Sequence, residues 1–255
     1  MPTKEVYGAQ PPIEILRQYL DHNGWYDNKE KTFRTIIDMM YVCAMGPPGG
    51  GRTFITPRFL RWFNVISVTE FDNEAMTGIF ESIIKFEFDK RAVSQTIKGL
   101  KDAVIKSTMD VYDSALEKLL PTPMKSHYLF NLRDFGRVIF GFLMADTSKL
   151  TNSEQVARLW VHEILRVYYD RLNDDADREW LIQYIREVLK KNWSLDLNKM
   201  MEHLMTEADE GVVGIPQMRR LIFTDFCGPD GKGGYAEVPD PQKAIEVCNT
   251  FLDDY

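Results

Sequence analysis

Cysteines and long apolar runs are scarce in this chain. The 255 residues include only three cysteines, and none of them has the CxxC spacing. A disulfide scaffold and a zinc site are therefore disfavoured, and a reducing compartment is the simple expectation. The apolar run from Ile36 to Met45 is broken by Asp38 and is too short to span a bilayer. Because the first residues, MPTKEVYGAQPP, also lack the apolar segment of a signal peptide, we expect a soluble intracellular chain with no membrane partner.

Positive charge is also in short supply. The chain has 31 Lys and Arg residues against 38 Asp and Glu residues, which gives a net charge of −7. Surfaces made mainly to bind nucleic acid are usually basic, so we expect no nucleic-acid partner, although a local basic site remains possible. Apolar residues make up 44% and charged residues 27% of the chain, an ordinary globular composition that excludes disorder throughout.

The usual phosphate-binding motifs are missing. The most glycine-rich run is GPPGGGR (46–52), but the Walker A pattern GxxxxGK[ST] requires Lys and then Ser or Thr after its last glycine. Here Arg52 and Thr53 follow Gly51, and no GxGxxG run is present elsewhere. We interpret this run as the exit from a strand into a loop, where glycine supplies backbone freedom.

Two other segments resemble metal sites but miss essential ligands. His162-Glu163 could begin the zinc motif HExxH, but the second histidine is replaced by Arg166. The run GPDGKGGYAE (228–237) resembles a calcium loop, but its first and third ligand positions fall on Phe226 and Gly228, which have no side-chain oxygen. We therefore predict no metal site in either segment.

The first 70 residues favour a fragment of an α/β layer. A short helix is expected from Glu14 to Asp21, and two apolar strands are expected at Asp38 to Met45 and Phe63 to Thr69. Both strands lack polar alternation, which is typical of a parallel sheet buried on both faces. Because two strands cannot form such a sheet alone, the segment from 38 to 69 is expected to expose strand edges and apolar surface.

The remainder reads as helices followed by a short α/β tail. Asp72 and Asn131 are expected N-caps, and Asn131 has Asp134 in the position of a capping box. Apolar periodicity and end signals predict helices in four further stretches. These are 93–119, 157–172, 177–191 and 195–208. A strand from Leu221 to Cys227, a glycine-rich loop and a helix from Gln242 to Leu252 complete the predicted fold, which is mostly α.

Three arginines are candidates for binding an anion. Arg58 and Arg61 lie three residues apart at a helix edge, and a guanidinium group matches the oxygens of a phosphate. Arg133 lies in the first turn of a predicted helix, where the helix dipole adds to its positive charge. The alternative is that these arginines form ordinary local ion pairs, in the case of Arg133 with Asp134 or Asp110.

Six segments carry motifs that become specific when they are read together. They are MPTKEVYGAQPPIEILRQ (1–18), DHNGWYD (21–27), VCAMGPPGGGR (42–52), TPRFLRWFN (56–64), LPTPMKSHYLFNLRDFGRVI (120–139) and RLWVHEILRVYYDRL (158–172). In this order and spacing, the chain resembles the C-terminal part of the third AAA+ module of a dynein heavy chain, together with its helical lid. The GPPGGGR and HNGWYD runs resemble the axonemal members of that family.

The resemblance implies three domains and a larger parent protein. Residues 1–70 would be the C-terminal part of an AAA+ large subdomain, residues 71–215 its helical lid, and residues 216–255 the start of the following module. The Walker A and B segments of the module would precede this chain. We therefore expect no cofactor and no ATPase activity in the chain itself, while the full-length motor would use ATP or ADP and Mg²⁺.

The resemblance also assigns roles to individual residues. Arg58 matches the arginine finger, with Arg61 as the second choice, and would reach nucleotide held by the preceding module. Arg133 matches the sensor-2 position and would contact nucleotide in its own module. The sensor-1 position falls on Gly46, which has no side chain to contact a γ-phosphate.

In function, the resemblance implies a lid that senses nucleotide and relays its state around a motor ring during ATP-driven microtubule motility. The direct partners would be neighbouring modules of the same heavy chain, with microtubules and other dynein chains reached through the whole motor. The expected location is the cytoplasmic cytoskeleton, in the axoneme of a cilium or flagellum. Two alternatives remain: a stand-alone helical adaptor derived from a dynein lid, and an independent nucleotide-binding enzyme, which the missing Lys and Mg²⁺ ligands disfavour.

Overall fold

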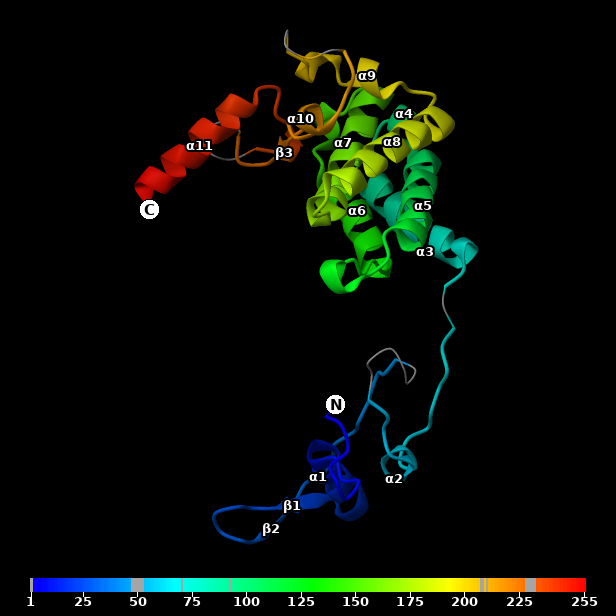
Figure 1. The fold of residues 1–255 in the computed structure, drawn as a ribbon, viewed down its shortest axis with the longest axis vertical. Coiled ribbons are helices and arrows are strands. Elements are labelled where there is room, and N and C mark those ends of the chain that lie inside the picture. Colours follow the sequence, from blue (N-terminus) through cyan, green and yellow to red (C-terminus); the bar gives the residue numbers. More distant parts are fainter. Residues whose placement is uncertain are drawn as a thin grey trace. The chain divides into compact units, whose positions relative to one another are not determined.

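The structure is a computed structural model in which the chain forms two compact units, Met1–Glu70 and Phe71–Tyr255 (Figure 1). It describes residues 2–46, 53–69, 71–91, 93–206, 209, 211–227 and 233–255. Within these ranges, no helix combines the length and the apolarity that crossing a membrane requires.

The first unit is built around helix α1 (Pro11–His22), which confirms the helix expected between Glu14 and Asp21. Strands β1 (Gly24–Tyr26) and β2 (Phe33–Thr35) follow and form an antiparallel pair with Trp25 opposite Arg34. Gly24 is required here, because a Cβ atom at this position would lie 2.2 Å from the carbonyl oxygen of Arg34. The short helix α2 (Pro57–Leu60) contributes Phe59 to a small core that it shares with α1.

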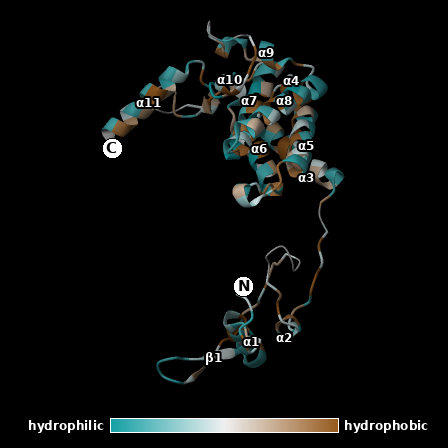
Figure 2. Ribbon diagram, viewed as in Figure 1, coloured by the Kyte–Doolittle hydropathy of each residue, from teal (hydrophilic) through white to brown (hydrophobic). Residues whose placement is uncertain are grey.

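The two strands predicted at 38–45 and 63–69 are wrong, since both segments are irregular. A strand is stable only when its backbone groups pair with a neighbour, and the described residues offer neither segment a partner strand. The expected exposure of apolar surface is confirmed: Val42 is 90% exposed and Ile66 is 83% exposed. Figure 2 shows hydrophobic residues along the extended segment that follows α2.

The second unit is a helical bundle. Its long helices are α3 (Asn73–Lys90), α5 (Lys101–Lys118), α6 (Leu132–Met144), α7 (Ser153–Val167) and α8 (Asp175–Asn192). Helix α6 packs on α7, while α5 packs on both α3 and α8. The apolar stripes expected from the sequence meet in one core, in which Trp160, Ile164 and Leu189 are completely buried.

Local end signals of the helices are confirmed, but three predicted helices are not continuous. The one predicted at 157–172 consists of most of α7 and a 3₁₀ turn, Tyr169–Arg171. Asp72 caps α3 by accepting a hydrogen bond from the Ala75 amide at 2.7 Å. The helix predicted at 93–119 is divided into α4 (Gln95–Lys98) and α5, because Gly99, a poor helix former, ends the first piece. The helix predicted at 195–208 is reduced to α9 (Leu197–Met200) and a 3₁₀ turn, Glu202–Leu204, while 207 and 208 lie outside the described residues.

The tail begins after the short helix α10 (Ile215–Met218). The strand predicted at Leu221 to Cys227 is shortened to β3 (Phe223–Thr224), which pairs antiparallel with β4 (Ala236–Glu237). Helix α11 (Pro241–Asp254) starts at the Asp240 cap and confirms the last predicted helix. The predicted class, mostly α with small α/β parts on either side of a helical bundle, is therefore confirmed.

Candidate functional site

Arg133 lies in the first turn of α6, and its side chain has no partner among the residues that the structure describes. The Asn131 side chain accepts a hydrogen bond from the Arg133 amide at 2.9 Å, and the Asn131 amide donates to Asp134 at 3.0 Å, which completes the predicted capping box. The exposed guanidinium group of Arg133 makes no hydrogen bond or ion pair with another residue that the structure describes. A positive charge is thus left available at the positive end of a helix dipole.

The local ion pairs considered for Arg133 are wrong because both acids have other partners. Asp110 binds Lys191 at 3.2 Å and accepts a hydrogen bond from Asn192 at 2.8 Å. Asp134 is 2% exposed and receives two hydrogen bonds from Arg171, at 2.8 and 3.2 Å. Because these acids are engaged, neither of them competes for the Arg133 guanidinium.

Arg171 connects the loop before α6 to the 3₁₀ turn that follows α7, Tyr169–Arg171. Besides Asp134, it donates to the carbonyl oxygen of Leu129 at 3.2 Å. Its guanidinium group also lies 4.9 Å from the centre of the Phe130 ring, within cation–π range. These contacts fix both the loop and the first turn that carry Arg133, so its backbone position is set by residues from two helices.

Arg58 and Arg61 form ion pairs inside the first unit, as the local alternative predicted. Arg58 donates a hydrogen bond to Glu14 of α1, and Arg61 donates to Asp21 at 3.0 Å. The Arg58 guanidinium is the main reason that the pKa of Glu14 is lowered. Both arginine side chains remain more than half exposed, at 55% and 60%, so each pair is weak enough to be exchanged for another anion.

Gly46 follows an irregular segment rather than the end of a strand, so the predicted strand context of the sensor-1 position is wrong. The rest of the glycine-rich run, 47–52, and the first half of the calcium-like loop, 228–232, lie outside the described residues. Among the residues that are described, no group of three His, Cys, Asp or Glu side chains gathers to hold a metal ion.

His162 and Glu163 of α7 are buried against the tail. The neutral imidazole of His162 donates from Nδ1 to the carbonyl oxygen of Leu221 at 3.0 Å, and burial lowers its pKa to about 4. Glu163 accepts a hydrogen bond from the Tyr235 hydroxyl at 2.7 Å, and burial raises its pKa to about 7. The sequence analysis considered this pair only as part of a zinc motif. The feature that could have indicated buried polar contacts is the position of two titratable residues within the apolar face of a helix.

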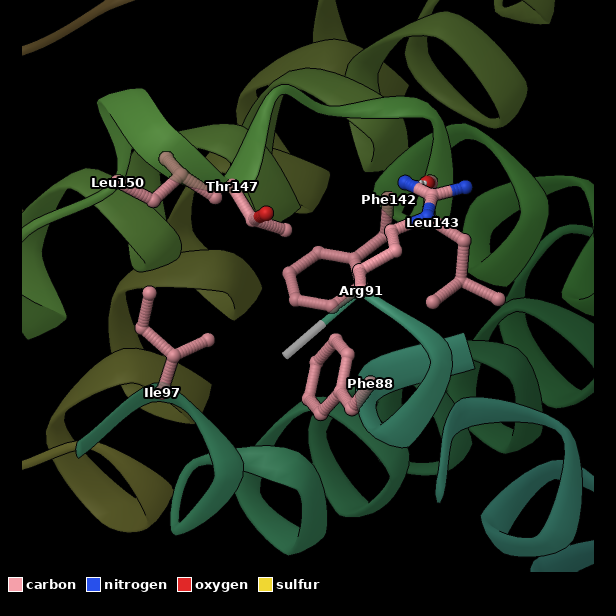
Figure 3. A pocket seen from close by; sticks show the side chains of 7 residues that line it. All are labelled: Phe88, Arg91, Ile97, Phe142, Leu143, Thr147 and Leu150. Carbon is pink, nitrogen blue, oxygen red and sulfur yellow. Dashed lines mark hydrogen bonds between the residues drawn. The ribbon is translucent and has the colours of Figure 1, made fainter. Parts of the chain in front are cut away.

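Two hollows lie near the bundle. A pocket of about 290 Å³ lies beside Arg158, whose Nε donates to both carboxylate oxygens of Glu237, at 2.9 and 3.1 Å. His203 shares that carboxylate at 2.7 Å, so the charges at this pocket are paired. The second hollow, of only about 10 Å³, is lined largely by apolar side chains such as Phe88 and Phe142 and is too small for a ligand (Figure 3).

Arg91 at the edge of the small hollow has a structural role. Its guanidinium group donates to the carbonyl oxygens of Leu143 and Ala145, which lie at the C-terminus of α6. These carbonyls have no partner within the helix, so a cation at this end is favourable. The two ends of α6 thus differ: the C-terminal end is capped by Arg91, whereas Arg133 at the N-terminal end is unpaired within the described part of the chain.

Comparison with known proteins finds family matches to the first unit and to part of the second. Residues 1–71 match the family described as "P-loop containing dynein motor region", and residues 104–203 match the "AAA+ lid domain". The chain is 43% identical over 258 residues to dynein axonemal heavy chain 12 of Mus musculus, with 100% of this chain and 8% of that protein covered. Human dynein axonemal heavy chains 3 and 1 are 41% and 37% identical, with 100% of this chain and 6% of each relative covered.

The chain thus spans less than a tenth of the length of these curated relatives. The likeness nevertheless extends over all of its residues, and the matched lid region contains the capped helix with the free Arg133. On this evidence the chain belongs to the dynein axonemal heavy chain family and carries AAA+ motor-region and lid sequence of that family.

Proposed function

We propose that this chain works as part of the third AAA+ module of a dynein motor ring, where its lid senses bound nucleotide and relays that state to neighbouring modules. The observation that carries the proposal is the guanidinium group of Arg133, which is unpaired among the described residues. It lies at the capped start of α6, within the region that matches the AAA+ lid domain. A fixed helix N-terminus with an unpaired arginine is suited to contact a phosphate group. Arg133 would act as the sensor-2 residue of its own module.

Arg58 is proposed as the arginine finger toward the nucleotide of the preceding module, with Arg61 as the second choice. Its pair with Glu14 must open for this role, and exposed pairs of this kind contribute only about 0–1 kcal/mol. A phosphate would compete with the carboxylate for the same guanidinium. Gly46, at the sensor-1 position, would contribute no side-chain contact.

The described residues fit one part of a nucleotide site and not the rest. Arginines can bind and orient a phosphate, but a P-loop Lys and the Ser/Thr and acidic ligands of Mg²⁺ would have to come from the upstream part of the module. When bound in the full motor, Mg-ATP supplies the phosphoryl group that is transferred. We therefore propose that the chain alone has no ATPase activity and acts as one component of an ATPase motor.

The partners and location follow from the same proposal. The lid would contact neighbouring AAA+ modules of its own heavy chain, and it would reach microtubules and other dynein chains only through the complete motor. The relatives are named as axonemal heavy chains, so we propose the axoneme of a cilium or flagellum as the place of action.

The proposal is tested by calorimetric titration with Mg-ATP. The chain itself is expected to show no micromolar binding. In a longer heavy chain that includes the upstream Walker segments, Arg133→Ala is expected to weaken binding at this module by about 10- to 150-fold, since a charge-assisted hydrogen bond contributes roughly 1.5–3 kcal/mol.

The matched control is Arg137→Ala, which removes an exposed arginine from the same helix, one turn further on. It is expected to leave nucleotide affinity unchanged. Equal affinities in the Arg133→Ala and Arg137→Ala variants would refute the proposed role of Arg133, and tight Mg-ATP binding by the chain alone would refute its proposed inactivity.

A further inference from the structure

Helix α7 carries two adjacent titratable residues on the side where the tail docks. His162 is 3% exposed and Glu163 is 5% exposed. His162 binds the carbonyl oxygen of Leu221, just before β3, while Glu163 binds the hydroxyl group of Tyr235, just before β4. Each residue therefore holds one strand of the tail hairpin.

The surroundings provide little to neutralise a charge on either residue. On the side of α6, Gly141 contacts the carboxyl group so closely that a Cβ atom would lie 1.9 Å from Glu163 Oε2. The cation acting on both residues is Arg166 of the same helix, and it is paired with Asp170 at 3.1 Å. The tail contributes the Tyr235 hydroxyl and, beyond it, the carboxylate of Asp225.

Burial therefore favours the neutral form of both groups, because an ion with one hydrogen bond and little water is unstable. In the docked state the pKa of His162 is lowered from 6.5 to about 4, and the pKa of Glu163 is raised from 4.5 to about 7. When the tail detaches, water reaches both side chains and each pKa returns toward its ordinary value. Docking then changes the proton affinity of the two residues in opposite directions.

We propose that His162 and Glu163 form a charge-compensated pair whose joint contribution to holding β3 and β4 against helix α7 is almost independent of pH. Between pH 4.5 and 6.5 the detached state holds an imidazolium and a carboxylate, whereas the docked state holds a neutral imidazole and a neutral carboxylic acid. One proton leaves the imidazole and one proton joins the carboxyl group. Docking therefore neutralises two charges with no net exchange of protons with solvent.

The two contributions have opposite signs. The raised pKa of Glu163 stabilises docking fully below pH 4.5, and this contribution is lost as pH rises through about 7. The lowered pKa of His162 disfavours docking at low pH, and this penalty disappears as pH rises through 6.5. From pH 5 to 8, Glu163 alone would weaken docking and His162 alone would strengthen it, each by about 10- to 100-fold, so the two contributions largely cancel.

The test is amide hydrogen exchange in the whole chain between pH 5 and 8, corrected for intrinsic exchange rates. Two amides report on docking and on the hairpin: Asp146, which donates to the carbonyl oxygen of Tyr235, and Val238, which donates to that of Ile222, both at 2.9 Å. In the unmodified chain, their protection is expected to change by less than about tenfold. In Glu163→Gln it should increase by about 10- to 100-fold with rising pH, and in His162→Asn it should decrease by about as much.

The controls are His127→Asn and Glu179→Gln, which change an exposed histidine and an exposed glutamate elsewhere in the bundle. Both should keep the flat profile. A flat profile in both Glu163→Gln and His162→Asn would overturn the proposal, as would a steep profile in the unmodified chain. A separate readout guards against misfolded variants: by NMR titration of the unmodified chain, the His162 imidazole should stay neutral down to about pH 5, and titration near pH 6.5 would also overturn it.

Discussion

Replacing Asp134 with alanine is expected to destabilise the second unit, because this buried carboxylate anchors the start of α6. The substitution removes the carboxylate that completes the capping box and pairs with Arg171. Loss of a helix cap costs about 1 kcal/mol. Breaking a fully buried ion pair costs about 3–5 kcal/mol, but Arg171 keeps 23% of its side chain exposed and can be hydrated.

These effects lead to an expected loss of about 2–3 kcal/mol in the free energy of unfolding, after the ion-pair cost is reduced for the hydration of Arg171. The assay is equilibrium unfolding in urea, followed by circular dichroism, because the second unit is mostly helical. The midpoint should fall while the slope of free energy against urea stays the same, since the folded core is unchanged.

Arg137→Ala is the control for this experiment. Arg137 also contacts Asp134, at 3.2 Å, but its side chain is 64% exposed, so its removal should cost less than about 1 kcal/mol. If Asp134→Ala were as stable as Arg137→Ala, the buried carboxylate would not be what holds the start of α6. The physical basis for a fixed Arg133 would then be lost.

Three smaller predictions concern other contacts. Gly141→Ala should lower the melting temperature, with a cost of about 1–3 kcal/mol, because its Cβ atom would overlap the buried Glu163 carboxyl group. Gly136→Ala on the same helix should raise the melting temperature, with a gain of up to about 1 kcal/mol in the free energy of unfolding, because the nearest atom to the new Cβ is 3.9 Å away. Arg58→Ala should change the hydrogen exchange of α1 amides by less than about fivefold, since an exposed pair contributes about 0–1 kcal/mol; a larger effect would show that this ion pair is structural.

The features of the fold that could be predicted are those whose signal is local. Asp72 and Asn131 predict the starts of their helices correctly, because a capping side chain and the amides that it binds lie within three residues of each other. The strands expected at 38–45 and 63–69 failed because a strand depends on partner strands that its own sequence does not contain. The prediction of one continuous helix through Gly99 was wrong, because the spacing of apolar residues continues across Gly99 although the helical backbone is interrupted there.

In the candidate site, too, local features could be predicted from the sequence and long-range contacts could not. The position of Arg133 could be found from its helix cap, but its freedom depends on Asp134 binding Arg171, which lies 37 residues further on. Likewise, the polar pair on α7 was visible in the sequence, whereas its partner Tyr235 lies 72 residues from Glu163. No spacing rule connects residues that far apart, so only the folded chain reveals these contacts.

The proposed sensing role depends most directly on where Arg133 lies when nucleotide is bound. The decisive measurement is a structure of a dynein heavy chain that contains this segment and its upstream Walker segments, determined with a non-hydrolysable ATP analogue. We expect the Arg133 guanidinium to lie within about 3.2 Å of a phosphate oxygen in its own module. A guanidinium that points into solvent while nucleotide occupies that module would contradict the proposed sensing role.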